Sequence, residues 1–277
     1  MVTKDQRRRQ LAREKFLRQQ ERRTAQRRKS VRRNAAVAAG LALVLGAGAF
    51  AYATDAFRGD EGKKDSAAPD ASPSGKPADP CGKPAAGKPN GKQWKKEPAL
   101  TVDRAASYTM RLETTCGDIG IAMDAAKAPH TVNSFGFLAG QGFFDHTKCH
   151  RLTAGGIYVL QCGDPEGTGR GGPGYTIPDE NLKDPKLKGK VYPAGTVAMA
   201  NQYNAQTGQG RDSGGSQFFL VYKDSPLPPD YTPFGTVTGG KDVLKKIADA
   251  GAAPPDAAQN TAPNATVVID RATVRKS

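Results

Sequence analysis

The stretch that decides the fold is Ser213-Gly214-Gly215-Ser216-Gln217-Phe218-Phe219-Leu220, in which a glycine-rich turn runs directly into a short apolar strand. Two further stretches that place polar side chains on strands come before it, Cys149-His150-Arg151-Leu152 and Gln161-Cys162-Gly163-Asp164. Because side chains alternate between the two faces of a strand, one of the two adjacent phenylalanines enters the core. We expect Phe218 to be the core residue.

Short stretches of alternating or apolar residues around these motifs predict eight strands. They cover residues 108–113, 118–123, 150–152, 158–162, 196–201, 218–222, 234–238 and 267–274, and residues 115–118 form a hairpin turn. Only residues 128–139, with Pro129 in the first turn, and residues 241–250 have helical periodicity. The pattern predicts a mainly β fold, a closed eight-stranded antiparallel β-barrel capped by two α-helices.

The positive charge of the chain is concentrated at its N-terminus. The formal net charge is +14, and residues 1–33 hold 14 Lys and Arg against three acidic residues, a surplus of 11. Residues 1–33 are therefore predicted to be a basic cytoplasmic segment. Since the remaining residues carry a surplus of only 3, we expect no nucleic-acid partner.

An apolar segment at residues 34–54 follows the basic segment. It contains AAVAAGLALVLGAGAFAYA (Ala35–Ala53), which has no charge and no proline and is just long enough, as a helix, to span a bilayer. The adjacent positive charge predicts a single-pass transmembrane signal anchor with a cytoplasmic N-terminus and an extracytoplasmic domain. The alternative is a cleaved signal peptide and a secreted product, since Ala51-Tyr52-Ala53 has the small-x-small form of a cleavage site.

Residues 55–103 are dense in Pro, Gly, Ala, Ser and Lys. Such a segment has too little apolar surface to offset the entropy of ordering, so we expect a disordered linker between the membrane and a domain at residues 104–277. Trp94 is the exception, because an aromatic residue at the end of a polar tether often docks on the neighbouring domain. Trp94–Leu100 is therefore predicted to be the first ordered segment.

In residue type and order, the three motifs resemble the active-site strands of the cyclophilins, which are β-barrel peptidyl-prolyl cis-trans isomerases. The resemblance covers about residues 108–274. It implies a monomeric isomerase without a cofactor that acts on proline-containing polypeptides. Rotating an X-Pro amide crosses a barrier of about 18–20 kcal/mol but breaks no bond, so a fixed guanidinium beside an apolar slot meets the chemical need.

The resemblance assigns roles to individual residues. Arg151, Gln161 and Gln217 match catalytic positions. The GTGRGGPGY run, Gly167–Tyr175, resembles the glycine-rich loop beside the site. Phe219 matches the floor of the proline pocket, and the full set of implied substrate-binding residues is His150, Tyr158, Met199, Ala200, Asn201, Phe219, Leu227 and Tyr231.

The chain departs from the cyclophilin pattern in three places. Arg151 and Gln161 are two residues further apart than is usual, which bears on the assignment of Tyr158. The glutamine motif reads Gln161-Cys162-Gly163-Asp164. Pro226 stands where cyclosporin-sensitive members carry Trp, which implies weak cyclosporin binding.

Four cysteines in an exported chain permit disulfides, and three full pairings are possible. If Arg151 and Gln161 share the active face, Cys149 lies on that face while Cys162 points the other way, which argues against a Cys149–Cys162 disulfide. We favour pairing of Cys116 with Cys149, and we expect Cys81 to be unpaired. His146 and His150 lie around a loop-to-strand junction and not on one helix face, so no metal site is expected.

Two functions are compatible with these residues. One is an isomerase that assists the folding of exported proteins. The other is a non-catalytic proline-peptide-binding module, tethered at the membrane, that uses the same pocket. Retention of Arg151 and Gln217 favours the enzyme, because binding alone tolerates their loss more readily.

Overall fold

A computed structural model describes residues 78–256 and 261–277 of the chain. The predicted basic segment at 1–33 and the predicted transmembrane segment at 34–54 lie outside these residues. None of the helices in the described part of the chain combines the length and the apolar character that a bilayer crossing requires. The elements, in chain order, are β1 (Tyr108–Thr114), β2 (Gly117–Met123), α2 (Pro129–Gly140), β3 (Thr147–Lys148), β4 (Arg151–Leu152), β5 (Val159–Cys162), η1 (Pro185–Leu187), β6 (Val191–Tyr192), β7 (Thr196–Met199), β8 (Phe218–Val221), β9 (Ser225–Pro226), β10 (Pro233–Gly239), α3 (Lys241–Asp249) and β11 (Val268–Lys276).

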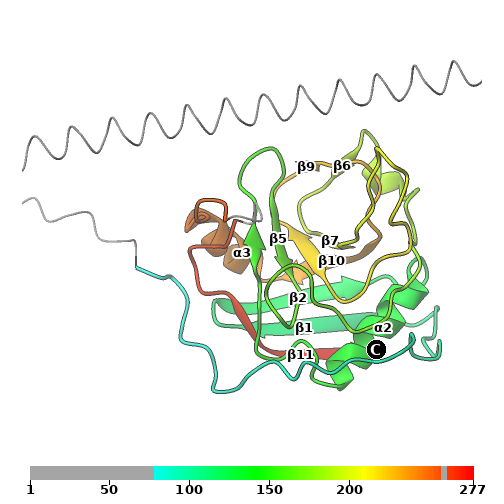
Figure 1. The fold of residues 1–277 in the computed structure, drawn as a ribbon, viewed down its shortest axis with the longest axis horizontal. Coiled ribbons are helices and arrows are strands. Elements are labelled where there is room, and N and C mark those ends of the chain that lie inside the picture. The colour runs from blue at the N-terminus through cyan, green and yellow to red at the C-terminus, as the bar shows by residue number, and fades with distance from the viewer. Residues whose placement is uncertain (1–77, 257–260) are drawn as a thin grey trace, which may run out of the picture. The chain divides into compact units, whose positions relative to one another are not determined.

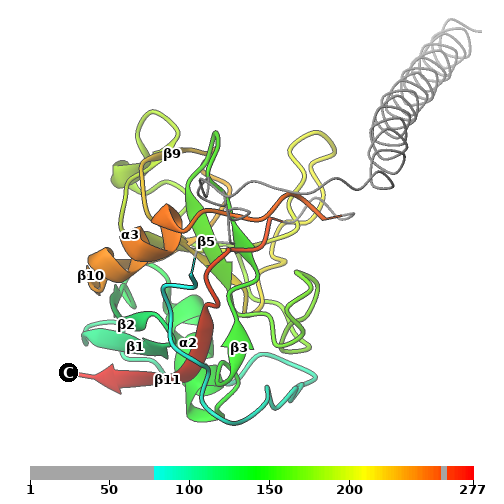
Figure 2. The same ribbon diagram turned by 90° about the vertical axis from the view of Figure 1, so that its left-hand side faces the viewer.

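Nine strands form one antiparallel sheet in the order β3-β11-β1-β2-β10-β7-β8-β5-β4, and β6 pairs with β9 in a second, two-stranded sheet. The large sheet curls, with α2 packed against β11 and α3 against β2 (Figures 1 and 2). Both helices were predicted, and each lies within one residue of the expected bounds.

The strand predicted at 150–152 differs from the observed structure. The chain pairs with β11 at Thr147–Lys148, breaks at Cys149 and His150, and pairs with β5 at Arg151–Leu152. The structure is thus a mainly β fold whose curled sheet has two ends, β3 and β4, where the sequence predicted a closed barrel of eight strands.

The hairpin of β1 and β2 has the predicted turn. Thr114 pairs with Gly117, whose φ of +128° lies in the region that favours glycine. On the inner face of this hairpin Leu112 lies opposite Ile119, and both side chains are fully buried. The period-2 pattern of the sequence therefore defines the face of the sheet that forms the core.

Four phenylalanine rings fill the core between α2 and the sheet. Phe135 of α2 lies 5.5 Å from Phe218 of β8, 4.6 Å from Phe234 of β10 and 5.2 Å from Phe144. Phe218 is fully buried, as predicted, so Phe219 faces the other side of the strand. The packing of α2 thereby fixes the orientation of β8 and of its outer face.

Residues 78–103, which we call the strap, lie along the surface of the domain (cyan in Figure 1). The strap is joined to the β1–β2 turn by a disulfide between Cys81 and Cys116, so the prediction that Cys81 is unpaired is wrong. Trp94 packs against Phe137 and Phe143, with ring centroids 5.1 Å and 6.0 Å away, which confirms the expected docking of this residue. This part of the predicted linker is thus docked on the domain, both covalently and through an aromatic cluster.

Candidate functional site

Cross-strand pairing brings four residues into one row. Arg151 in β4 lies opposite Gln161 in β5, Gln161 lies opposite Phe219 in β8, and Phe219 lies opposite Ala198 in β7. Directly opposed residues of an antiparallel sheet point to the same face. The outer face of four adjacent strands therefore carries a guanidinium, an amide, an aromatic ring and a methyl group in line.

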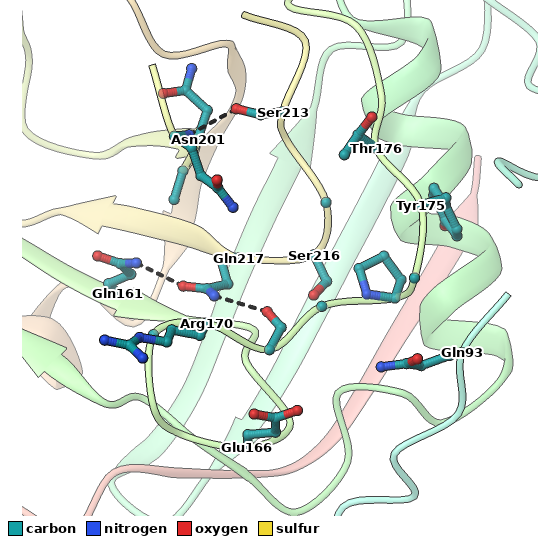
Figure 3. Close-up of a pocket in the computed structure, with 18 residues that line it drawn as sticks. Gln93, Gln161, Glu166, Arg170, Tyr175, Thr176, Asn201, Ser213, Ser216 and Gln217 are labelled. Carbon is teal, nitrogen blue, oxygen red and sulfur yellow. Dashed lines mark hydrogen bonds between the residues drawn. The ribbon is translucent and has the colours of Figure 1, made fainter. Parts of the chain in front are cut away.

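A chain of hydrogen bonds connects the polar members of the site. The Arg151 guanidinium donates from Nη1 to Gln161 Oε1 over 3.3 Å, and Gln161 Nε2 donates to Gln217 Oε1 over 2.9 Å. Gln217 Nε2 in turn donates to the carbonyl oxygen of Gly171 over 2.9 Å (Figure 3). The three predicted catalytic residues are thus assembled, and each amide is held in one orientation by its neighbours.

An apolar cluster lies beside this chain, and we call it the slot because it holds the residues predicted to form the proline pocket. Phe219 is only 4% exposed and packs with Val159, Ala198, Val221 and Tyr192 in a cluster separate from the main core. Leu227, Tyr231 and Ala200, all predicted substrate-binding residues, pack against this cluster. The ring of Tyr231 stands edge-on to that of Phe219, with 5.4 Å between centroids.

The buried phenol of Tyr192 stiffens the slot. The hydroxyl of Tyr192 donates to the carbonyl oxygen of Tyr231 over 2.7 Å. Burial raises the pKa of both Tyr192 and Tyr231 above the ordinary value of 10.0, so both remain uncharged at neutral pH. The slot is therefore apolar and carries no charge of its own.

Two predicted substrate-binding residues, Met199 and Tyr158, have side chains outside the slot. Met199 is buried in the main core. The ring of Tyr158 packs against Tyr222, 5.9 Å between centroids, while Ile157 joins the Phe219 cluster in its place. The longer connection between Arg151 and Gln161 explains this exchange, because it ends the regular strand alternation before β5 begins.

His150 precedes Arg151 and is half-buried. Its Nδ1 and Nε2 atoms are buried and have no hydrogen-bond partner among the described residues. Burial lowers the pKa of His150 below 6.5, against the opposing effect of the nearby Asp164 carboxylate. The imidazole is thus neutral at physiological pH and supplies no charge to the site.

A polar cavity of about 390 Å³ lies beside the hydrogen-bonded glutamines (Figure 3). Its walls are Gln161 and Gln217, Asn201, the glycine-rich loop and, from the strap, Gln93. The backbone N–H of Trp94 donates to the carbonyl oxygen of Pro173 over 2.8 Å, which holds the strap against this loop. No pattern in the sequence predicts that the strap reaches the site.

Asp164 organises the glycine-rich loop. It is fully buried, and its Oδ2 accepts the backbone N–H groups of Thr168, Gly169 and Arg170 over 2.9, 2.6 and 3.1 Å. Burial alone raises the pKa of Asp164, but the N–H donors outweigh it and hold the pKa below 3.8. The ionised carboxylate thus keeps the loop in the position where Gly171 accepts from Gln217.

The second disulfide joins Cys149 to Cys162. The sequence prediction argued against this pair and favoured Cys116–Cys149, and both expectations are wrong. Both expectations require an unbroken strand from Cys149 to Arg151, whereas the chain breaks at Cys149–His150 between β3 and β4. Strand alternation does not hold across such a break, so Cys149 turns inward to meet Cys162.

Arg211 is a rim residue that sequence reasoning missed. Its guanidinium donates to the carboxylates of Asp179 and Asp230 and stacks 3.4 Å from the ring centroid of Tyr203. Asn201 Nδ2 donates to the same two residues, to Asp179 Oδ1 and to the Asp230 carbonyl oxygen over 3.4 and 2.8 Å. Although partial burial opposes it, the hydrogen bond to Asp230 raises the pKa of Arg211, which therefore stays charged.

The class of this domain is defined by a curled antiparallel sheet that carries an arginine, two glutamines and a phenylalanine on one face. A family model identifies that class. The model of the cyclophilin type peptidyl-prolyl cis-trans isomerase/CLD family matches residues 109–274, so the chain belongs to this family. This confirms the resemblance seen in the sequence motifs.

Similar proteins come from bacteria and from a protozoan. Over 157 residues, 53% of this chain and 51% of the relative, the chain is 50% identical to the probable peptidyl-prolyl cis-trans isomerase B of Mycobacterium leprae. It is 42% identical over 123 residues to the peptidyl-prolyl cis-trans isomerase B of Bacillus subtilis. This match covers 44% of this chain and 77% of that protein. The crystal structure of a Cryptosporidium parvum cyclophilin type isomerase matches with a TM-score of 0.50 and 26% identity, over 62% of this chain and 99% of that one. The chain spans about half the length of the mycobacterial relatives it matches.

Proposed function

We propose that the chain catalyses cis-trans isomerisation of X-Pro bonds in polypeptides. The observation that carries this proposal is the Arg151 guanidinium, held by Gln161 at the edge of the slot that Phe219 floors. No nucleophile or titrating base is needed, since the reaction is a rotation about a C–N bond.

Each part of the site has a role in this rotation. The substrate proline ring enters the slot between Phe219 and Tyr231, where burial of the ring holds one side of the amide still. The prolyl nitrogen becomes pyramidal as the amide twists, and an N–H of Arg151 donates to it. Because this hydrogen bond is stronger to the twisted amide than to either planar form, it lowers the barrier.

The glutamines and Asn201 serve the rest of the peptide. Gln161 orients the guanidinium, and Gln217 and Asn201 present amide groups to the polar cavity, where the substrate backbone lies. These contacts align the peptide so that its proline ring meets the slot and its prolyl nitrogen meets Arg151.

Replacement of Arg151 tests the proposal. An Arg151→Ala variant is expected to keep its fold and lose most of its turnover, measured by NMR exchange between cis and trans peaks of a proline peptide. Arg275→Ala, which removes an exposed arginine at the end of β11, is the matched control and should behave as wild type. Peptide binding without accelerated exchange in the wild-type protein would favour the non-catalytic binding module.

We further propose that the enzyme is membrane-anchored through residues 34–54, with the domain outside the cytoplasm, where it assists the folding of exported proteins. The basic flank of the apolar segment supports this orientation. The two disulfides add support, since disulfides are typical of proteins outside the cytoplasm. Mass measurement of the native protein tests the anchor, because a product beginning near Thr54 would indicate a cleaved signal peptide and a secreted enzyme.

Two finer features of the domain belong to the same proposal. The sheet closes as a barrel through residues 147–152, since β3 and β4 are separated only by Cys149 and His150 and the N–H of Cys149 donates to the Val267 carbonyl oxygen over 2.9 Å.

The enzyme is a monomer, because one chain supplies every residue of the proposed mechanism. Light scattering coupled to size-exclusion chromatography tests the oligomeric state.

A further inference from the structure

We propose that the Cys149–Cys162 disulfide is a positioning device for Arg151, holding the end of β4 so that the guanidinium stays beside the slot. The inference rests on the proposed isomerase function. It makes Cys149 and Cys162 positioning residues, since neither side chain faces the substrate.

Arg151 stands at the end of a short strand. β4 is two residues long and lies at the end of the sheet, where its ladder consists of the Arg151–Gln161 and Leu152–Leu160 pairs. Beyond Leu152 the segment is held further, since the N–H groups of Leu152 and Thr153 donate to the Thr261 and Val159 carbonyl oxygens over 2.7 and 3.0 Å. Arg151, the residue with the central chemical role, stands at the other end of the strand, next to the break, and strand ends open locally with little free energy.

The Cys149–Cys162 disulfide lies next to this strand end. Cys149 comes two residues before Arg151, and Cys162 directly follows Gln161. The cross-link therefore joins β5 to the segment just before β4, beside the Arg151–Gln161 pair. It lies at the point where the chain leaves β11 and turns to β5, which is the break between β3 and β4.

The cross-link lies on the core side of the sheet, opposite the slot. Cys149 is 4% exposed and Cys162 fully buried, and both belong to the main core, whereas Gln161 and Phe219 face the slot. The disulfide thus holds the backbone from behind without occupying substrate space. The side-chain bond that it protects, Arg151 to Gln161, is already 3.3 Å long, so a shift of a few tenths of an ångström breaks it.

Paired alanine variants test the inference. In C149A/C162A, the exchange rate of enzyme-bound peptide should fall about tenfold, since a misplacement of about 1 Å can cost up to about a hundredfold. Peptide affinity should stay within about twofold, because the slot residues Phe219 and Tyr231 belong to other segments. The matched control C81A/C116A removes the strap disulfide and should keep both values within about twofold of wild type. Equal rates in the two variants would overturn the inference.

A double-mutant cycle separates positioning from general damage. In an Arg151→Ala background, removing the Cys149–Cys162 link should have no further effect on the rate, because both changes act on one guanidinium. C149V/C162A refills most of the core volume without a cross-link and should remain as slow as the alanine pair. Recovery of wild-type turnover in C149V/C162A, or failure of both variants to fold, would show that the disulfide serves packing or folding and would overturn the inference.

Wild-type protein tests the proposed function separately. If it does not accelerate exchange at all, the isomerase proposal fails, and the positioning of β4 is then read from hydrogen exchange. The amide of Leu152, which donates to the Thr261 carbonyl oxygen over 2.7 Å, should exchange faster in C149A/C162A and not in C81A/C116A. Unchanged protection of Leu152 in C149A/C162A would refute the positioning role.

Discussion

Breaking the strap disulfide should destabilise the domain more than breaking the disulfide at the site. Cys81 and Cys116 are 35 residues apart in the sequence. Because the link lowers the entropy of the unfolded chain, it adds about 3.8 kcal/mol to the free energy of unfolding at 25 °C. Cys149 and Cys162 are 13 residues apart, which gives about 2.9 kcal/mol. We therefore expect C81A/C116A to lose about 1 kcal/mol more than C149A/C162A, the reverse of the order expected for turnover.

The single tryptophan makes this difference measurable, because Trp94 lies in the strap itself. Urea unfolding is followed in parallel by Trp94 fluorescence, which reports undocking of the strap, and by far-UV circular dichroism, which reports the sheet. The two transitions should coincide in wild type and in C81A/C116A, with a loss of about 3 to 4 kcal/mol in the free energy of unfolding. A loss below about 1 kcal/mol, or a fluorescence transition well before the dichroism transition, would refute the reasoning, since the strap would then not unfold with the domain.

Three further outcomes are expected. Pro226 is exposed and supplies neither an indole face nor an N–H donor, so cyclosporin should inhibit wild type about ten- to a hundredfold more weakly than a Pro226→Trp variant, and inhibition of wild type at low nanomolar concentration would contradict this. Arg211→Ala should weaken peptide affinity severalfold while leaving the bound-state exchange rate unchanged, because Arg211 holds Asp230 beside the slot, and unchanged affinity in a peptide titration would show that the rim holds without it. Burial holds the pKa of His150 below 6.5, so the unfolded chain binds this proton more readily; stability should fall as pH drops below about 6.5, and urea unfolding of His150→Gln between pH 7.5 and 5.5 should show a weaker pH dependence.

The local pattern of the sequence was sufficient to predict which face of a strand is buried and where the helices lie. Period-2 alternation placed Phe218 in the core and Phe219 on the opposite face, and helical periodicity located α2 and α3 within a residue. These assignments succeed because burial of one face is decided by the spacing of residues within a single element. The order of the motifs around Arg151, Gln161 and Gln217 likewise identified the family, without knowledge of the hydrogen bonds that join these three residues.

Only the tertiary structure decided which distant segments meet. The alternation rule failed at Cys149, because the chain changes partner from β11 to β5 there, and Cys149 meets Cys162. Cys81 meets Cys116 because the strap docks on the β1–β2 turn. Tertiary packing also decides that Ile157, and not Tyr158, lies at the slot. It likewise brings Gln93 of the strap to the polar cavity. Periodicity describes a regular strand or helix, whereas breaks, longer loops and docked segments take their positions from packing against partners far away in the sequence, which a local pattern does not contain.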